Sequence, residues 1–303
     1  MRFAFALILA SLLGHAAPAV AAVPTDATIP SYHGEPSRSG SYIVPGLSWA
    51  AAPNMRRDTS FDGRVDGHVY AQPLYWRPAG AARGLLIIAT ESDVVTALDA
   101  ETGRTVWHTR LGDPVSRAAM PCGDINPLGI TGTPVIDPAA ATIYLDAMVS
   151  RSGTPAHLVF GLRLADGAVL SGWPIDVQQA MQTRGIAFSP RVQGQRSALA
   201  MLDGRVFIAF GGNFGDCGDY HGMVLGISID PPHAVAAWTT SGLKGGIWAP
   251  GGISSDGRAL FVTTGNTAGA QQWAGGEAAF RLGPDLAHSA SPRDWFAPVN
   301  WKA

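Results

Sequence analysis

The stretch from residue 95 to residue 107 reads Val-Thr-Ala-Leu-Asp-Ala-Glu-Thr-Gly-Arg-Thr-Val-Trp. Over residues 95–99, Val, Ala and Asp alternate with Thr and Leu, which fits the two-residue period of a pleated strand. Residues 100–103 form a turn, because Gly103 can take the positive φ that closes a hairpin without a Cβ clash. Residues 105–107 return as a short outer strand. The stretch therefore predicts two antiparallel strands, the second ending at a tryptophan.

The same plan recurs along the chain in four units, each with a marker tryptophan near its last strand: Trp107, Trp173, Trp238 and Trp295. Inner strands are expected over 70–75, 133–136, 198–202 and 252–254. Four consecutive strands joined by short turns make one antiparallel sheet, which is the unit of a β-propeller. We therefore predict an all-β protein, a β-propeller of four-stranded antiparallel blades with about four blades present. The alternative is a β-sandwich with coincidental tryptophans, but Pro73 and Pro134 occupy the same place in two units, which favours the propeller.

Composition narrows the possible partners. The chain has 303 residues and is 47% hydrophobic, enough for a sizeable core. Its 37 Gly and 22 Pro are scattered, as suits a protein with many turns. The formal net charge is −2 and no basic cluster occurs, which argues against a nucleic-acid partner. A small polar ligand or a protein partner is expected instead.

The N-terminus predicts export. Arg2 precedes an apolar run over 3–13, and Ala19-Val20-Ala21 is an Ala-x-Ala cleavage signal. We expect a signal peptide over 1–22, an N-terminal segment over 23–67 with one strand of a closing blade, and propeller repeats over 68–303. An uncleaved anchor helix is the alternative, but the run is too short to span a membrane comfortably. The mature chain is expected in the periplasm or secreted, without a membrane anchor.

Two cysteines, Cys122 and Cys217, would then enter an oxidising compartment. Strand order places both in loops of neighbouring blades on the same face of the propeller. A disulfide between them is therefore predicted, with two unpaired thiols as the alternative. No Cys-x-x-Cys spacing supports a zinc site.

The pattern Ala97-x-Asp99-x-x-Thr102-Gly103-x-x-x-Trp107 resembles the tryptophan-docking repeat of quinoprotein-type β-propellers. The segments 69–75, 89–93, 122–127 and 129–137 resemble exported bacterial proteins with pyrroloquinoline-quinone-like propeller repeats. Blades of this kind build larger rings, so we expect the four units to be part of a larger propeller. Many such relatives have no established activity. The superfamily also includes quinoprotein alcohol dehydrogenases and the propeller lipoprotein of outer-membrane assembly, whose N-terminal lipid-bearing cysteine has no counterpart here.

The dehydrogenase resemblance would imply pyrroloquinoline quinone in the funnel, a calcium ion with oxygen ligands and a carboxylate base. Thr264-Gly265-Asn266 resembles the turn that gives those enzymes an amide ligand for the metal, and Glu91 or Asp93 would offer a carboxylate. The adjacent Cys-Cys disulfide of many such enzymes is absent.

Strand order also predicts which loops gather on one face. The candidate ligand-binding residues there are Glu91, Asp93, Asp124, Asn126, Arg184, Asp216, Asp219, His221, Lys244 and Trp248, with Asn266 as the candidate metal ligand. Converging carboxylates, amides and aromatic groups suit a polar ligand or an ion. Alternatively, the Asp and Asn side chains only shape their loops through Asx turns. Our leading hypothesis is an exported propeller that binds a ligand or partner without catalysis in this stretch, and the alternative is a quinone- and calcium-dependent dehydrogenase with an incomplete site.

Overall fold

The computed structural model describes residues 28–44, 47–78, 80–289 and 291–301. The predicted signal peptide lies outside the described residues. What is described is almost entirely β-structure, with one short α-helix, α1 (Val177–Gln182), and two short 3-10 helices, Ala52–Asn54 and Arg117–Ala119. Among the described residues, no helix has the length and apolar character needed to cross a membrane.

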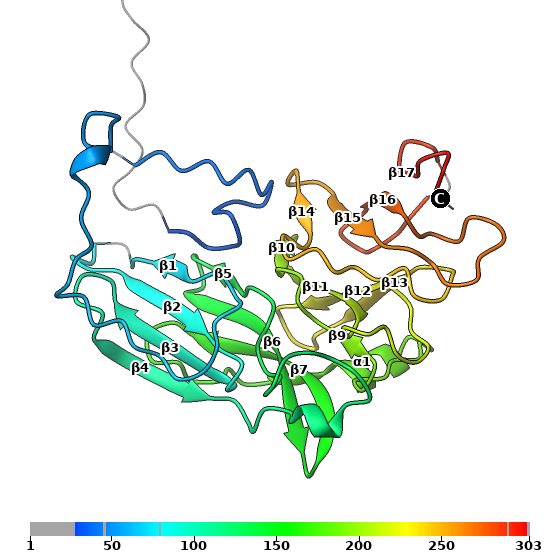
Figure 1. Cartoon of the computed structure of the whole chain (residues 1–303), viewed down its shortest axis with the longest axis horizontal. Coiled ribbons are helices and arrows are strands. Elements are labelled where there is room, and N and C mark those ends of the chain that lie inside the picture. The colour runs from blue at the N-terminus through cyan, green and yellow to red at the C-terminus, as the bar shows by residue number, and fades with distance from the viewer. Residues whose placement is uncertain (1–27, 45–46, 79, 290, 302–303) are drawn as a thin grey trace, which may run out of the picture.

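Four antiparallel sheets follow one another along the chain, and we call them blades 1 to 4 (Figure 1). Blade 1 consists of β1 (Leu74–Trp76), β2 (Leu85–Ala89), β3 (Val94–Asp99) and β4 (Thr105–Arg110). Blade 2 consists of β5 (Val135–Asp137), β6 (Thr142–Arg151), β7 (Thr154–Arg163) and β8 (Ile175–Asp176). Blade 3 consists of β10 (Ala200–Leu202), β11 (Arg205–Gly212), β12 (Met223–Ser228) and β13 (Val235–Thr239), with β9 (Gln193–Gly194) paired to the end of β11. Blade 4 consists of β14 (Ser254–Ser255), β15 (Leu260–Thr264), β16 (Ala278–Leu282) and β17 (Trp295–Phe296).

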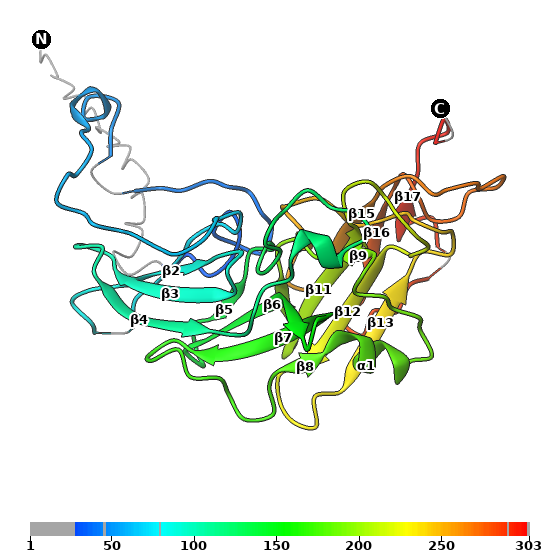
Figure 2. The same ribbon diagram turned by 60° about the horizontal axis from the view of Figure 1, so that its bottom comes forward.

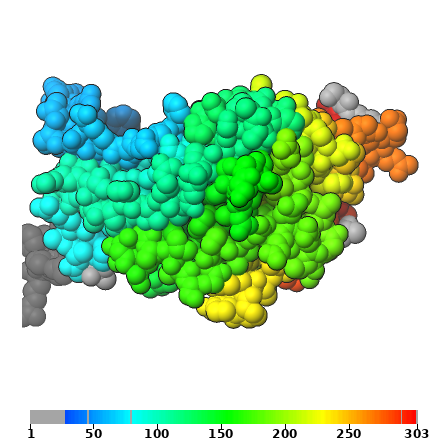
Figure 3. Space-filling model, turned by 90° about the horizontal axis from the view of Figure 1, so that it is seen from below, coloured from blue at the N-terminus to red at the C-terminus, as the bar shows by residue number. Residues whose placement is uncertain are grey.

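Strand order inside each blade is sequential, so the predicted propeller architecture is confirmed. The blades follow one another across the molecule in chain order, as the colours in Figures 2 and 3 show. Ile87 and Val95 of blade 1 meet Leu145 and Leu158 of blade 2 in one apolar core. A second core lies between blades 2 and 3, and a third between blades 3 and 4.

Trp107 shows how the repeat motif works. Its ring is 9% exposed, and its Nε1 donates to the main-chain oxygen of Leu164 in blade 2, 2.9 Å away. Asp99 Oδ1 accepts hydrogen bonds from the main-chain nitrogen and the hydroxyl of Thr102, both 2.8 Å away, and Gly103 has φ +73°. Asp99 and Thr102 stabilise the turn, and Trp107 forms a hydrogen bond that connects blade 1 to blade 2.

Five predicted strand boundaries need correction, and two of them are the starts of β5, at Val135 rather than Thr133, and of β10, at Ala200 rather than Ala198. The inner strand of blade 1 begins at Leu74 rather than Tyr70, after Pro73, which cannot donate to a ladder. In blade 2 the outer strand follows Trp173 and Pro174 and contains only Ile175–Asp176. In blade 4 the inner strand is Ser254–Ser255, because Gly252 has a positive φ of +64° that no strand residue adopts.

The N-terminal segment does not supply a strand of a closing blade among its described residues. Residues 28–40, which we call the N-terminal strap, instead run along the inner strands of all four blades (Figure 1). Ile29 exchanges two main-chain hydrogen bonds with Tyr75 of blade 1, at 2.8 and 3.2 Å. The Pro30 oxygen accepts from the Ile136 nitrogen of blade 2 at 2.7 Å.

Arg38 attaches the strap to the other two blades. Its guanidinium donates to the main-chain oxygens of Leu199, before β10, and Ile253, before β14, at 2.7 and 2.9 Å. The Pro36 oxygen accepts from the Ser255 nitrogen at 2.8 Å. The strap thus joins the first blade to the fourth.

Replacing Trp107 with Phe should lower the free energy of unfolding by about 1–3 kcal/mol, because it deletes the bond to Leu164 and leaves unfilled space between two blades. Urea denaturation followed by circular dichroism measures this. Trp49→Phe is the matched control, since Trp49 is 95% exposed and should unfold like the parent. Equal midpoints for all three proteins would contradict the docking role of Trp107.

Candidate functional site

One face of the propeller gathers the loops β2–β3, β4–β5, β11–β12, β13–β14 and β15–β16, and we call it the funnel face. Hydrogen bonds link these loops across blade boundaries, for example from the Gly129 nitrogen of the β4–β5 loop to Glu91 of the β2–β3 turn. The predicted disulfide between Cys122 and Cys217 is confirmed, with Cα atoms 6.0 Å apart. It joins the loops of blades 2 and 3 that strand order assigned to the same face.

Glu91 and Asp93 are buried in the wall rather than open to the funnel, both with 0% exposure. Glu91 accepts from Gly129 N at 2.6 Å and from the Thr131 hydroxyl at 2.7 Å, while burial raises its pKa to about 7. Neither carboxyl oxygen of Asp93 has a hydrogen-bond partner. Burial, together with the nearby Glu91 and Asp146 carboxylates, raises the pKa of Asp93 to about 9. Asp93 is therefore a neutral acid at pH 7.

Sequence analysis missed a second buried pair. Asp146 on β6 and His157 on β7 are each 2% exposed, with Oδ2 and Nδ1 2.6 Å apart. His157 Nε2 faces the main-chain oxygen of Gln193 at 3.1 Å, so this nitrogen carries a proton. Burial lowers the pKa of His157, but the adjoining Asp146 outweighs this effect and the pKa is raised. The pair cross-links two adjacent strands at the blade 2–blade 3 boundary, and the near-continuous apolar runs of those strands gave no signal for it.

Three predicted residues meet in one network on blade 3. Lys244 Nζ lies 2.6 Å from the Asp216 main-chain oxygen and 3.3 Å from its Oδ2. Tyr220 donates its hydroxyl proton to Asp216 Oδ1 and also interacts with the Trp248 indole. Burial, then the hydrogen bond to Asp216, raises the pKa of Tyr220. Side chains at Gly211, Gly246 or Gly265 would collide with the Trp248 ring, which explains why glycines surround it. The Lys244 ammonium and the Asp216 carboxylate of this network therefore pair with each other.

The remaining candidates are more dispersed. Asn126 Oδ1 accepts from the Arg117 nitrogen at 3.0 Å and so shapes its own loop. His221 Nδ1 lies 2.9 Å from the Thr240 oxygen. Asp219 and Arg184 are exposed, and within the described residues neither side chain forms a hydrogen bond or an ion pair with the other candidates.

Calcium and the quinone do not fit the described residues. Asn266 is exposed, and no group of three or more His, Cys, Asp or Glu side chains within the described part of the chain is arranged to hold a metal ion. Each carboxylate oxygen of Glu91 already accepts a hydrogen bond, one from Gly129 and the other from Thr131. Lys244, one of the candidate cations of this face, is paired with Asp216. No reaction step is derived through either group.

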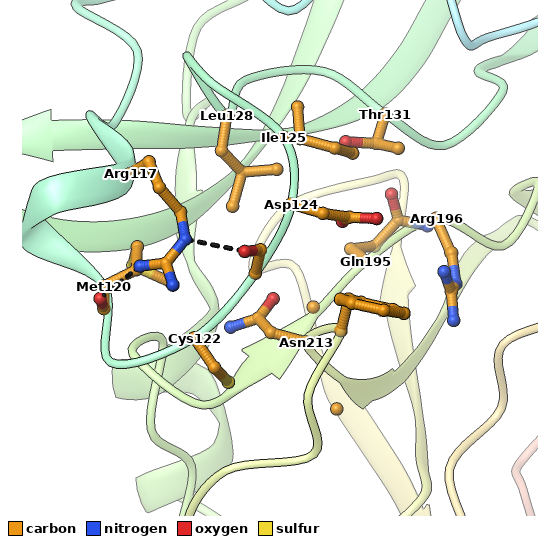
Figure 4. A pocket seen from close by; sticks show the side chains of 14 residues that line it. Arg117, Met120, Cys122, Asp124, Ile125, Leu128, Thr131, Gln195, Arg196 and Asn213 are labelled. Atoms are coloured by element: carbon orange, nitrogen blue, oxygen red, sulfur yellow. Dashed lines mark hydrogen bonds between the residues drawn. The ribbon is translucent and has the colours of Figure 1, made fainter.

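A small cavity of about 50 Å³ opens between the β4–β5 loop and blade 3 (Figure 4). Two residues singled out from the sequence, Cys122 and Asp124, line the cavity. Other residues of its lining are Arg117, Thr131, Gln195, Arg196 and Asn213. Gln195 is 6% exposed, and its Oε1 has no hydrogen-bond partner. Its Nε2 donates to the Ser197 oxygen, which can only accept, so the orientation of the amide is fixed.

Sequence reasoning missed Gln195, which lies directly after β9 on the segment that leads to the blade 3 inner strand, β10. β9 pairs Gly194 with Gly211, which anchors the residue just before Gln195 at the funnel end of β11. Gly132 leaves room for the Gln195 amide, because any side chain there would overlap it. Whether the Gln195 oxygen finds a partner depends on loops that are distant in sequence, so no local sequence pattern predicts that it is unpartnered.

No family model matches the chain, and no curated protein matches it by sequence. Solved structures do share its fold. A quinohemoprotein alcohol dehydrogenase from Pseudomonas putida HK5 superposes with a TM-score of 0.63 and 13% identity over 90% of this chain and 40% of that chain. The quinohemoprotein alcohol dehydrogenase from Comamonas testosteroni gives 0.60 and 14% over 89% and 41%, and a europium-containing methanol dehydrogenase gives 0.61 and 14% over 92% and 50%.

The chain has the propeller fold of the quinoprotein dehydrogenases. It spans between 40% and 50% of the length of these three structures. The expected resemblance is thus confirmed at the level of fold, since identities of 13% and 14% carry no catalytic residue across.

Asp93→Asn should reduce the pH dependence of stability. The folded-state pKa of about 9 lies above the ordinary value of 3.8, so the contribution of Asp93 to folding is present below about pH 4 and is lost as the pH rises towards 9. Asparagine cannot ionise and tolerates the positive φ of 56° found here. Thermal unfolding between pH 5 and 9 should show a smaller decline for the variant than for the parent.

Asp113→Asn is the control, because Asp113 is exposed and contributes only a minor charge near Asp93, opposed by Arg110. Glu91, with its pKa of about 7, remains in both variants and leaves a residual decline. Parallel pH profiles for the parent and Asp93→Asn would show that Asp93 does not ionise in the folded chain.

Proposed function

We propose that this chain is an exported propeller repeat protein that binds a small polar ligand on its funnel face, in the cavity between blades 2 and 3. The observation that carries the proposal is the Gln195 amide oxygen, buried and unpartnered in the wall of that cavity. A buried acceptor without a donor costs about 1–3 kcal/mol, and a ligand that donates a hydrogen bond removes this cost.

Two features support the setting of the site. The Cys122–Cys217 disulfide closes the loops that flank the cavity, so the walls are held before a ligand arrives. Pre-organised walls reduce the ordering cost of binding. A disulfide also suits an oxidising compartment, which agrees with the signal peptide expected from the sequence.

Gln195→Met tests the proposal, because methionine keeps the length of the side chain and removes the amide oxygen. The probes are glycerol, glycine, methylamine and acetate, each titrated into the ¹⁵N-labelled protein. At least one probe should shift the main-chain amide signals of Gly123, Gly194 and Gly212, and the affinity should fall about tenfold in the variant.

Gln178→Met is the matched control. The Gln178 amide nitrogen also donates to a main-chain oxygen, that of Phe188 at 3.1 Å, but Gln178 does not line the cavity. This variant should bind like the parent. Shifts that persist unchanged in Gln195→Met, or no shifts with any probe, would overturn the proposal.

The alternative function is a dehydrogenase dependent on pyrroloquinoline quinone and calcium, and it is supported by likeness of fold alone. Because the described residues do not fit either group, we expect no dye-linked alcohol oxidation when the quinone and Ca²⁺ are added together. Asn266→Ala is the diagnostic variant: activity in the parent that this substitution abolishes would favour the dehydrogenase and displace the binding proposal.

A further inference from the structure

The hydrogen-bonding groups and charges that line the cavity beside Gln195 limit the chemical class of ligand that it can bind. The following inference rests on the function proposed above. One part of the wall offers only acceptors. Gln195 Oε1 is unpartnered, and Asp124 forms no hydrogen bond or ion pair within the described residues. The Thr131 hydroxyl donates to Glu91, which leaves its oxygen free to accept. Figure 4 shows these three side chains in one part of the cavity.

A group placed there must donate several hydrogen bonds. A primary ammonium has three donors and no acceptor, and it also carries the charge that the Asp124 carboxylate attracts. The exposed Phe214 ring, 64% accessible, also lines the cavity and adds an aromatic face that favours a cation.

The cavity also carries positive charge. Arg117 is committed, since its Nε donates to the Gly123 oxygen at 2.6 Å and its Nη1 to the Met120 oxygen at 2.8 Å. Arg196 is exposed and forms no hydrogen bond or ion pair with any described residue. Its planar guanidinium is suited to a carboxylate.

A purely cationic ligand would face two guanidinium groups, and a purely anionic ligand would face Asp124 and an acceptor-lined wall. A zwitterion satisfies both parts. We infer that the cavity binds a small α-amino acid or a close chemical relative, with its ammonium towards Gln195, Asp124 and Thr131 and its carboxylate towards Arg196. Ile125 and Leu128, which also line the cavity, would contact a small apolar side chain.

Calorimetric titration with glycine, methylamine, acetate and glycerol tests this assignment. Glycine should bind about tenfold more tightly than either singly charged probe, since only glycine pairs with both Asp124 and Arg196. Asp124→Asn should weaken glycine and methylamine binding but spare acetate. Arg196→Gln should weaken glycine and acetate binding but spare methylamine.

Two variants control for general changes in surface charge. Asp219→Asn removes an exposed carboxylate of the β11–β12 loop, and Arg191→Gln removes an exposed guanidinium on the chain leading to β9; neither residue lines the cavity. Both should bind glycine like the parent. Glycerol binding as tightly as glycine would overturn the zwitterion assignment and leave the polar-ligand site standing, whereas no binding of any probe would overturn both.

Discussion

The middle strands of blades 2 and 3 carry apolar side chains on both faces, and neither face is stable in water. β6, β7, β11 and β12 are buried along most of their length, so each sheet must lie between two neighbours. Burying one large apolar side chain stabilises by about 1.5–3 kcal/mol, whereas one hydrogen bond such as that from Trp107 contributes about 1 kcal/mol. Packing therefore holds the blades together, and the tryptophan bond sets their orientation. Once sheets stack in this way, alternate loops must emerge on one face, which is where the cavity forms.

Stacking leaves the inner edges of the sheets incomplete, because edge strands present unpaired main-chain groups. The N-terminal strap covers these edges and bonds to every blade. Arg38 attaches the strap to blades 3 and 4. Burial lowers the pKa of Arg38 to about 10, so its side chain is still charged at neutral pH. The guanidinium donates to three different main-chain oxygens. A partly buried cation surrounded by carbonyl oxygens has its desolvation cost offset by charge-assisted bonds. The strap consequently couples blade 1 to blade 4, which share no strand pairing.

The parts that were predictable from sequence are those encoded locally. Asp99, Thr102 and Gly103 lie within one turn, and Trp107 follows at a fixed distance, so the hairpin and the blade plan could be inferred. The disulfide also followed, because strand order alone assigns Cys122 and Cys217 to one face. The strap could not be inferred, since its partners in the blades are main-chain nitrogens and oxygens, which have no sequence signature. The same holds for Gln195, whose environment comes from Gly132 and Ser197 together with the loop of blade 2.

Glu91 and Asp93 were singled out from the sequence as carboxylates for chemistry, but the structure buries both in the wall of the propeller. Glu91 ties the β2–β3 turn to the next blade, and Asp146 pairs with His157 across two strands. A group that already has its full set of partners offers nothing to a ligand. Gln195 is the reverse case: its amide nitrogen donates to the Ser197 oxygen, and its amide oxygen has no hydrogen-bond partner although the residue lines a cavity. The proposed site therefore depends on an unpartnered acceptor that lines a cavity, whereas the unpartnered oxygens of Asp93 lie outside that lining.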